Sequence, residues 1–165
     1  MFELHSYKKK KISSFHFLKV SIWYLINNFF IYSFIPSSAL RVFFLKVFGA
    51  QIGKNVKIHP YTNVKYPWKL RIGDNCWIGA RTWIDNIENV IIGNNCCISQ
   101  DVYFCTGNHN FKKKEFDLIA EQIIIYDNCW IGAKSIICPG VSLKKNSIIK
   151  INTTITKNHP SVFFA

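Results

Sequence analysis

From Ile52 to near the end of the chain, large apolar residues fall in groups within which they recur at every sixth position. Twelve of these fifteen residues are isoleucine. An α-helix repeats every 3.6 residues and a strand every two, so neither has this period. Three short strands per turn, with six residues for each strand, do have it. The pattern therefore predicts a triangular prism whose large side chains point to the axis, at Ile52, Ile58, Val64, Ile72, Ile78, Ile84, Ile92, Ile98, Phe104, Ile125, Ile131, Ile137, Leu143, Ile149 and Ile155.

A second set of residues lies two positions before each of these and is mostly small or β-branched. It includes Thr62, Cys76 and Ser135, and we expect it to fill the narrow space beside the corners. Asn and Gly occupy the predicted corners because they tolerate the left-handed backbone of tight turns. The fifteen hexads make about five coils of an all-β, parallel β-helix. At about 4.8 Å per coil, the prism is roughly 24 Å tall.

The repeat is broken at three places. The joins from 64 to 72 and from 84 to 92 carry two extra residues each, which we expect to form small bulges at a corner. The third break, from Phe104 to Ile125, is 21 residues long. It predicts one loop, near residues 107–122, that leaves the prism with His109 at its root. Function on a rigid scaffold is usually carried by such interruptions.

Residues 1–49 differ from the β-helix predicted for residues 50–160 and from a short tail at 161–165. An apolar run covers residues 20–35, which is shorter than the ~20 residues that span a bilayer. Pro36 ends it, and residues 37–50 indicate a short amphipathic helix capped by Ser37 or Ser38 and ended by Gly49. Two interpretations stay open. The helical segment packs on the main domain or a partner subunit, or residues 8–48 lie on a membrane surface.

The formal net charge of +12 favours anionic partners, and each of the segments 1–50 and 51–165 contributes +6. Nucleic acid is not expected, because no groove-reading helix or RNA-binding motif accompanies the charge. Of the six cysteines, Cys76, Cys96 and Cys129 fall in the small inward set and are interpreted as packing residues. No metal site is expected, because a three-histidine zinc site would need partners for His109 in the adjoining coils.

Three segments resemble one family of enzymes in detail. They are CISQDVYFCTGNHNF at 97–111, IIIYDNCWIGAKSIICPGVSL at 123–143 and ITKNHP at 155–160. The stretch ALRVFFLKVFGAQIGKNVKIHP at 39–60 agrees with the same family. The chain thus resembles the hexapeptide-repeat acetyltransferases, in particular the colanic acid and exopolysaccharide O-acetyltransferase group. The resemblance implies a left-handed β-helix, acetyl-CoA as acetyl donor and a sugar hydroxyl as acceptor. It also implies a cytoplasmic homotrimer with active sites between subunits.

Within this resemblance, His109 matches the general base. A neutral imidazole can take the proton of a sugar hydroxyl as the hydroxyl attacks a thioester, so no acyl-enzyme is needed. A backbone N–H of the coil would stabilise the oxyanion. The positions that match cofactor contacts are Trp130, Gly132, Ala133, Lys150, Ile151, Thr156 and Lys157, with Lys134 as a further candidate for the cofactor phosphates.

Four residues are candidates for binding the acceptor. Asn108 and Asn110 flank His109, and Asp85 and Asn86 lie one coil below the loop, where a corner role is equally consistent with their position. Relatives carry small residues where this chain has KINT at 150–153. An inactive β-helix scaffold is therefore kept as the alternative function. We also hypothesise that the acceptor is a lipid-linked saccharide, because the N-terminal apolar segment would hold the enzyme at a membrane.

Overall fold

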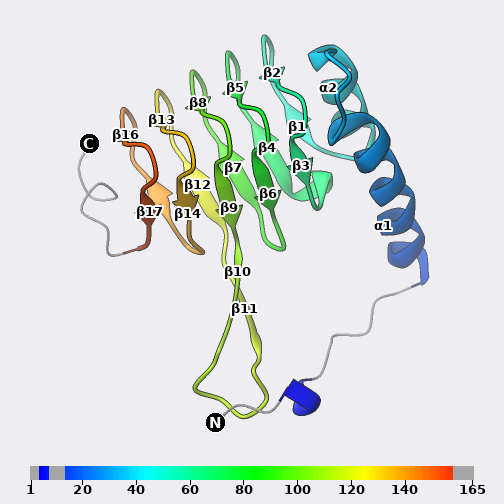
Figure 1. Ribbon diagram of the computed structural model, residues 1–165, viewed down its shortest axis with the longest axis vertical. Coiled ribbons are helices and arrows are strands. Elements are labelled where there is room, and N and C mark those ends of the chain that lie inside the picture. Colours follow the sequence, from blue (N-terminus) through cyan, green and yellow to red (C-terminus); the bar gives the residue numbers. More distant parts are fainter. Residues whose placement is uncertain (1–3, 8–13, 158–165) are drawn as a thin grey trace.

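The computed structural model describes residues 4–7 and 14–157. Short parallel strands stack into a prism, two helices cover one end of it, and a two-stranded arm leaves one side (Figure 1). The predicted tail at 161–165 and the ring of His159 lie outside the described residues.

Three parallel sheets of five strands form the faces of the prism. Sheet 1 contains β1 (Gln51–Ile52), β4 (Leu70–Ile72), β7 (Val90–Ile92), β12 (Ile123–Ile125) and β15 (Ser142–Leu143). Sheet 2 contains β2 (Lys57–Ile58), β5 (Trp77–Ile78), β8 (Cys97–Ile98), β13 (Trp130–Ile131) and β16 (Ile148–Ile149). Sheet 3 contains β3 (Asn63–Val64), β6 (Trp83–Asp85), β9 (Tyr103–Cys105), β14 (Ile136–Ile137) and β17 (Thr154–Ile155). The chain visits the sheets in turn, so the predicted parallel β-helix of five coils is confirmed.

The core consists of the residues that the six-residue period selects. All fifteen large positions are buried, and the most exposed of them, Ile52, is only 8% exposed. Cys76, Cys96 and Cys129 stack on successive coils, and each thiol donates to a carbonyl of the next coil, over 3.0 Å from Cys76 Sγ to the Gly93 oxygen. These cysteines are therefore packing residues, as expected. Burying this apolar surface is the main stabilising contribution to the fold.

The first corner, between sheets 1 and 2, is held by a column of asparagines. Asn55, Asn75, Asn95, Asn128 and Asn146 all have positive φ angles. Their side-chain amides bond along the prism axis, with Asn55 Nδ2 donating to Asn75 Oδ1 over 3.0 Å and Asn128 donating to Asn146 over the same distance. Asparagine suits this corner because it adopts the left-handed conformation and supplies both a donor and an acceptor.

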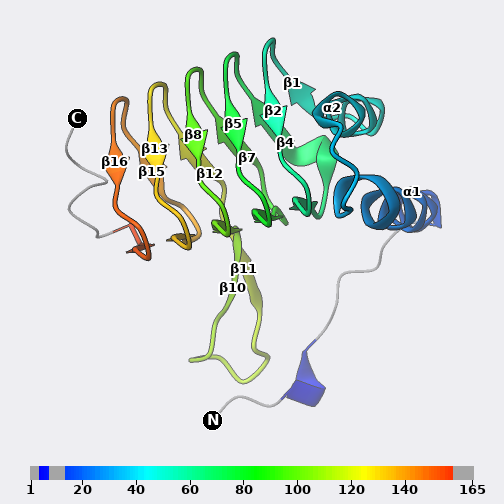
Figure 2. The ribbon, with the colours of Figure 1, turned by 45° about the horizontal axis from the view of Figure 1, so that its top comes forward.

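All three breaks of the repeat fall at the third corner, between sheets 3 and 1. The first is a 3-10 turn, η3 (Pro67–Lys69), and the second is a turn at 86–89. The third is the arm, in which β10 (Gly107–His109) pairs antiparallel with β11 (Leu118–Ala120), with Asn108 opposite Ile119 (Figure 2). The predicted extruded segment near residues 107–122 is therefore a hairpin arm. Both faces of the hairpin contact solvent, so its strands carry no alternation of apolar and polar residues.

Three helical elements near the N-terminus cover the first coil, namely α1 (Ser14–Ile26), the π-helical turn η2 (Asn27–Ile31) and α2 (Ser38–Val47). The short turn η1 (Leu4–Ser6) lies apart from them, near the arm (Figure 1). Ser37 caps α2 by accepting from the Leu40 N–H, and Gly49 follows it with a φ of +98°, as predicted. Trp23 fixes α1 to the prism, since its Nε1 donates to the Val64 carbonyl over 2.8 Å. Among the described residues, no helix has the length and apolar character needed to cross a bilayer.

Candidate active site

The arm holds His109 at the end of β10 in a defined orientation. Its Nδ1 lies 2.7 Å from the Phe116 carbonyl oxygen. Its ring stacks on the Phe116 ring, with centroids 4.4 Å apart and planes within 6° of parallel. Because a carbonyl can only accept, we assign the proton to Nδ1, which leaves a lone pair on Nε2. A neutral imidazole with a free Nε2 is suited to take a proton from a hydroxyl.

The residues on either side of His109 shape the arm. The Asn108 side-chain oxygen accepts from the His109 N–H over 2.8 Å, and the Asn110 side-chain oxygen accepts from the Lys112 N–H over 3.1 Å. The edge of the Tyr7 ring meets the His109 ring with centroids 5.5 Å apart. The side-chain nitrogens of Asn108 and Asn110 have no hydrogen-bond acceptor among residues 4–7 and 14–157, so both are available to an acceptor molecule.

Thr106 anchors the arm to the prism, and sequence reasoning missed it. It is fully buried, its Oγ1 donates to the Asp85 carbonyl over 2.9 Å, and the same oxygen accepts from the Glu88 N–H over 3.0 Å. These bonds tie the arm to the coil below it. A buried threonine just after the hexad looks like an ordinary corner residue, so the sequence carries no signal for this role. Phe116 and Tyr7 were missed for a similar reason, since both contact His109 from segments outside the repeat.

The structure gives the side chains of Asp85 and Asn86 different surroundings. Asn86 is fully buried, its Nδ2 donates to the Tyr66 carbonyl over 2.7 Å, and its Oδ1 accepts from the Tyr66 N–H over 2.9 Å. Both functional groups of Asn86 are therefore committed to the third corner, which is the structural role considered above. Asp85 instead faces outward. Its carboxylate lies 2.7 Å from Lys65 Nζ and accepts a longer bond from the Tyr103 hydroxyl.

The second corner, between sheets 2 and 3, presents unpaired backbone donors. Gly132 turns the chain there, and a Cβ on it would lie 2.6 Å from the Ile151 nitrogen. Ala133 and Ile151 occupy the same place on successive coils, since the Asn152 N–H donates to the Ala133 carbonyl over 2.8 Å. Within the described part of the chain, the N–H groups of Ala133 and Ile151 have no acceptor. These two N–H donors, one on each of two successive coils, suit a ligand that carries several carbonyl groups and lies along the prism.

The side chains around this corner are exposed. Trp130 on β13 is 51% exposed, and its Nε1 donates to Ser99 Oγ over 3.0 Å. Lys134 and Lys150 also lie on the surface of the second corner. Lysines here can act as mobile charges for phosphate groups.

Thr156 and Lys157 follow β17 and lie at the third corner, away from the other predicted cofactor contacts. Lys157 Nζ is 2.7 Å from the Glu121 carboxylate at the base of the arm. Within one chain, the seven predicted cofactor positions thus divide between two corners. They are separated by the width of sheet 3, whose strands begin near the second corner and end near the third.

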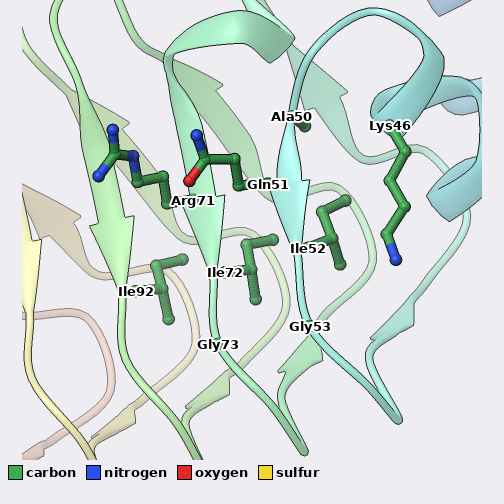
Figure 3. A pocket seen from close by; sticks show the side chains of 9 residues that line it. All are labelled: Lys46, Ala50, Gln51, Ile52, Gly53, Arg71, Ile72, Gly73 and Ile92. Atoms are coloured by element: carbon green, nitrogen blue, oxygen red, sulfur yellow. The ribbon is translucent and has the colours of Figure 1, made fainter.

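A shallow hollow of about 640 Å³ lies on sheet 1 beside the first corner, away from the arm. Figure 3 shows Lys46, Gln51 and Arg71 around it, with Ile52 and Ile72 beneath. It contains none of the residues predicted for catalysis or for binding.

Comparisons with known proteins place this geometry in a family. The family described as the hexapeptide repeat of succinyl-transferase matches residues 69–103 and 122–157. A protein of Escherichia coli strain K12 that carries the name colanic acid biosynthesis acetyltransferase WcaF is 33% identical over 145 residues. That match covers 87% of this chain and 80% of the relative. The chain therefore belongs to the hexapeptide-repeat acetyltransferases.

Two solved structures show the same fold. A hexapeptide-repeat acetyltransferase of Vibrio cholerae, complexed with acetyl-CoA, has a TM-score of 0.80 at 19% identity, covering 93% of this chain and 84% of that one. A galactoside acetyltransferase in complex with coenzyme A has a TM-score of 0.73 at 22% identity, covering 95% and 80%. The expected fold and family are confirmed. The roles of the individual site residues stay predictions.

Proposed function

We propose that this protein transfers the acetyl group of acetyl-CoA to a sugar hydroxyl in the synthesis of a bacterial surface polysaccharide. The observation that carries the proposal is the 2.7 Å contact between His109 Nδ1 and the Phe116 carbonyl, which favours the tautomer that a general base needs. The matched relatives named as acetyltransferases support the reaction class, and the structural neighbours complexed with acetyl-CoA and coenzyme A support the donor. His109 is the catalytic residue in this proposal.

The reaction follows from that assignment. The sugar oxygen attacks the thioester carbonyl while its proton passes to His109 Nε2. The tetrahedral oxyanion accepts a hydrogen bond from a backbone N–H of the second corner, at Ala133. Collapse of the intermediate breaks the carbon–sulfur bond, and the departing thiolate takes the proton back from His109. The sugar leaves as its acetyl ester, coenzyme A leaves as the thiol, and the histidine is neutral again.

The site is complete only between copies of the chain in this proposal. His109 extends from the third corner, and the free N–H groups of Ala133 and Ile151 lie at the second. A homotrimer of parallel prisms would bring the arm of one copy to the second corner of its neighbour. We expect a mixture of two inactive variants, His109→Ala and Ala133→Asp, to recover activity after the subunits are exchanged, because some mixed interfaces would carry no substitution.

The helical end has the character of a surface that binds anionic lipid. Residues 4–73 contain twelve Lys or Arg and no Asp or Glu, so the excess positive charge belongs to this part of the sequence. Leu18, Leu25 and Phe29, which form one stripe along α1 and η2, are each more than half exposed. An exposed apolar stripe on a basic segment of the chain suits the inner face of the cytoplasmic membrane, where a lipid-linked saccharide acceptor would be found. Vesicle flotation with anionic lipid tests this, with Leu25→Glu expected to weaken the binding.

An assay of coenzyme A release against a panel of saccharides tests the central proposal. We expect His109→Ala to lower kcat by about 10² to 10⁴, the usual contribution of a general base. Full activity of that variant would remove His109 as the base. The inactive scaffold is the second candidate, favoured by the pairing of Lys157 with Glu121. Calorimetry separates the two functions, because a scaffold would not bind acetyl-CoA.

A further inference from the structure

A cleft of about 490 Å³ lies between the helical layer and sheet 3, on the first two coils. Residues of α1 and η2 form one wall, including Tyr24 and Asn28. Residues of β3 and β6 form the other, including Asn63, Trp83 and Asp85. The volume is within the range of small-molecule sites, and such sites combine apolar walls with a few placed polar groups.

Trp83 forms an aromatic wall of the cleft and is supported by a stacking contact with Tyr103. Its ring is 45% exposed and stacks on Tyr103 of the next coil, with centroids 4.6 Å apart and planes within 24° of parallel. Tyr103 does not line the cleft, so the cleft meets Trp83 on the side away from Tyr103. The face of an aromatic ring carries negative charge density, which attracts the C–H groups on the face of a pyranose. Bracing from behind lowers the entropy lost when a ligand packs on the ring.

Neighbouring side chains hold the polar groups of the cleft in place, and the charges of these groups nearly cancel. The Asp85 Oδ1 is buried and lies 2.7 Å from Lys65 Nζ, whereas its Oδ2, which accepts a long bond from the Tyr103 hydroxyl, retains a lone pair that can accept from a further hydroxyl group. The Asn63 Oδ1 accepts from Asn27 Nδ2 over 2.9 Å, which directs the Asn63 Nδ2 elsewhere as a donor. In the described residues this nitrogen has no acceptor. A ligand with several hydroxyl groups can form hydrogen bonds both with the acceptor of Asp85 and with the donor of Asn63. A charged ligand would gain little binding energy from a site whose charges nearly cancel.

The cleft also lies close to the base of the arm. Asp85 pairs in register with Cys105 on the next coil, and the Thr106 hydroxyl donates to the Asp85 carbonyl. Gly107 and β10 follow directly, so the cleft ends one coil below the strand that carries His109. A saccharide held against Trp83 is therefore on the same side of the molecule as the proposed base.

We propose that this cleft binds a neutral pyranose residue of the acceptor glycan, remote from the hydroxyl that is acetylated. The inference rests on the proposed sugar O-acetyltransferase function and extends it, because it assigns Trp83 to the recognition of the acceptor and gives Asp85 a defined partner. Trp83 packs on the pyranose face, and Asp85 and Asn63 bond to its hydroxyl groups. The occupants that compete for the same space are an acyl chain and a side chain from a second copy.

The test uses ligand-observed NMR on the full chain without acetyl-CoA. Methyl β-D-galactopyranoside, methyl α-D-glucopyranoside and methyl α-L-fucopyranoside are the probes, and saturation transfer to their ring protons is measured. We expect at least one probe to bind the wild type, with its signal reduced at least fivefold in Trp83→Ala and in Asp85→Asn. Trp77→Ala is the matched control, since Trp77 lies on the same coil and is 52% exposed on sheet 2. It should keep the signal.

Three results would overturn the proposal: no probe binds the wild type, Trp83→Ala keeps the signal, or Trp77→Ala loses as much. Circular dichroism melting excludes a loss of fold in each variant, and Trp83→Phe, which keeps a ring, should restore part of the signal. His109→Ala separates this proposal from the previous one. It should bind the probes normally and release coenzyme A about 10² to 10⁴ times more slowly than the wild type. If it released coenzyme A at the rate of the wild type, the proposed role of His109 would fail and the saccharide site would stand.

Discussion

His109 Nδ1 lies 2.7 Å from the carbonyl oxygen of Phe116, which faces it from the far side of the arm. The side chain of Phe116 also stacks on the imidazole. One residue therefore orients the proposed base twice, through its backbone and through its ring. A substitution of Phe116 by alanine removes the ring and keeps the carbonyl group, so the contribution of the ring can be measured alone.

Phe116→Ala removes the stacked ring and leaves the carbonyl acceptor. We expect kcat to fall about tenfold, since a loosened imidazole is aimed less well at the hydroxyl, with KM for acetyl-CoA unchanged. Steady-state kinetics of coenzyme A release measures both constants. Phe111→Ala, at an exposed position of the same arm, is the control and should leave kcat as it is. A change confined to KM would contradict a positioning role for Phe116.

Lys157 and Glu121 give a test of the cofactor contacts. If Lys157 binds a cofactor phosphate, it must give up its ion pair with Glu121 to do so. Lys157→Gln should then raise the Kd for coenzyme A several-fold, and Glu121→Gln should lower it or leave it unchanged. Calorimetry reads both values. If both substitutions raise the Kd equally, the ion pair itself is what matters, and Lys157 does not touch the cofactor.

Arg41 is expected to hold the helical layer together. It is fully buried, and its guanidinium donates to the carbonyls of Ile31, Ser33, Ile35 and Ser37, whereas no carboxylate in the described part of the chain pairs with it. Burial lowers the pKa of Arg41 from its ordinary value, although it stays charged at neutral pH. Arg41→Met would leave these carbonyls without their donor, at a cost of about 3 kcal/mol in the free energy of unfolding. Urea unfolding measures this, and Arg71→Met, at an exposed position, should change little.

The ion pair of Arg81 and Asp101 predicts that the stability of the folded protein depends on pH in the acidic range. Arg81 Nε lies 2.7 Å from Asp101 Oδ1, and the hydrogen bond from Arg81 lowers the pKa of the Asp101 carboxyl. A depressed folded pKa stabilises the protein above the unfolded pKa of roughly 4, and the stabilisation is lost as pH falls through the folded value. Arg81→Gln should therefore be slightly less stable than the wild type at pH 7 and equal to it near pH 2. A gap in melting temperature that persists at pH 2 would contradict this.

The six-residue period was enough to predict the coils, because a large apolar residue occupies every buried position of the period from Ile52 to Ile155. The cap at Ser37 and the end of the helix at Gly49 were predictable for a similar reason, since both depend on local backbone chemistry. Each of these features is decided by residues that are close together in the sequence.

The features that the period does not control were not predictable. The pairing of Lys157 with Glu121 joins side chains 36 residues apart, and the stacking of Trp83 on Tyr103 depends on which outward residues meet between coils. The hairpin form of the arm was also missed, because its strands are stabilised by each other and not by burial. The candidate site was therefore located by the break in the repeat, whereas its geometry needed the structure.

The three insertions at the third corner have a consequence for how such a chain can diversify. Every coil closes through the same hydrogen bonds to its neighbours, whatever length of chain leaves that corner. A gain or loss of residues there moves no strand out of alignment, whereas a single added residue within a hexad would turn the following side chains from inside to outside. The third corner thus acts as an edge at which new recognition elements can be grafted while the scaffold keeps its dimensions.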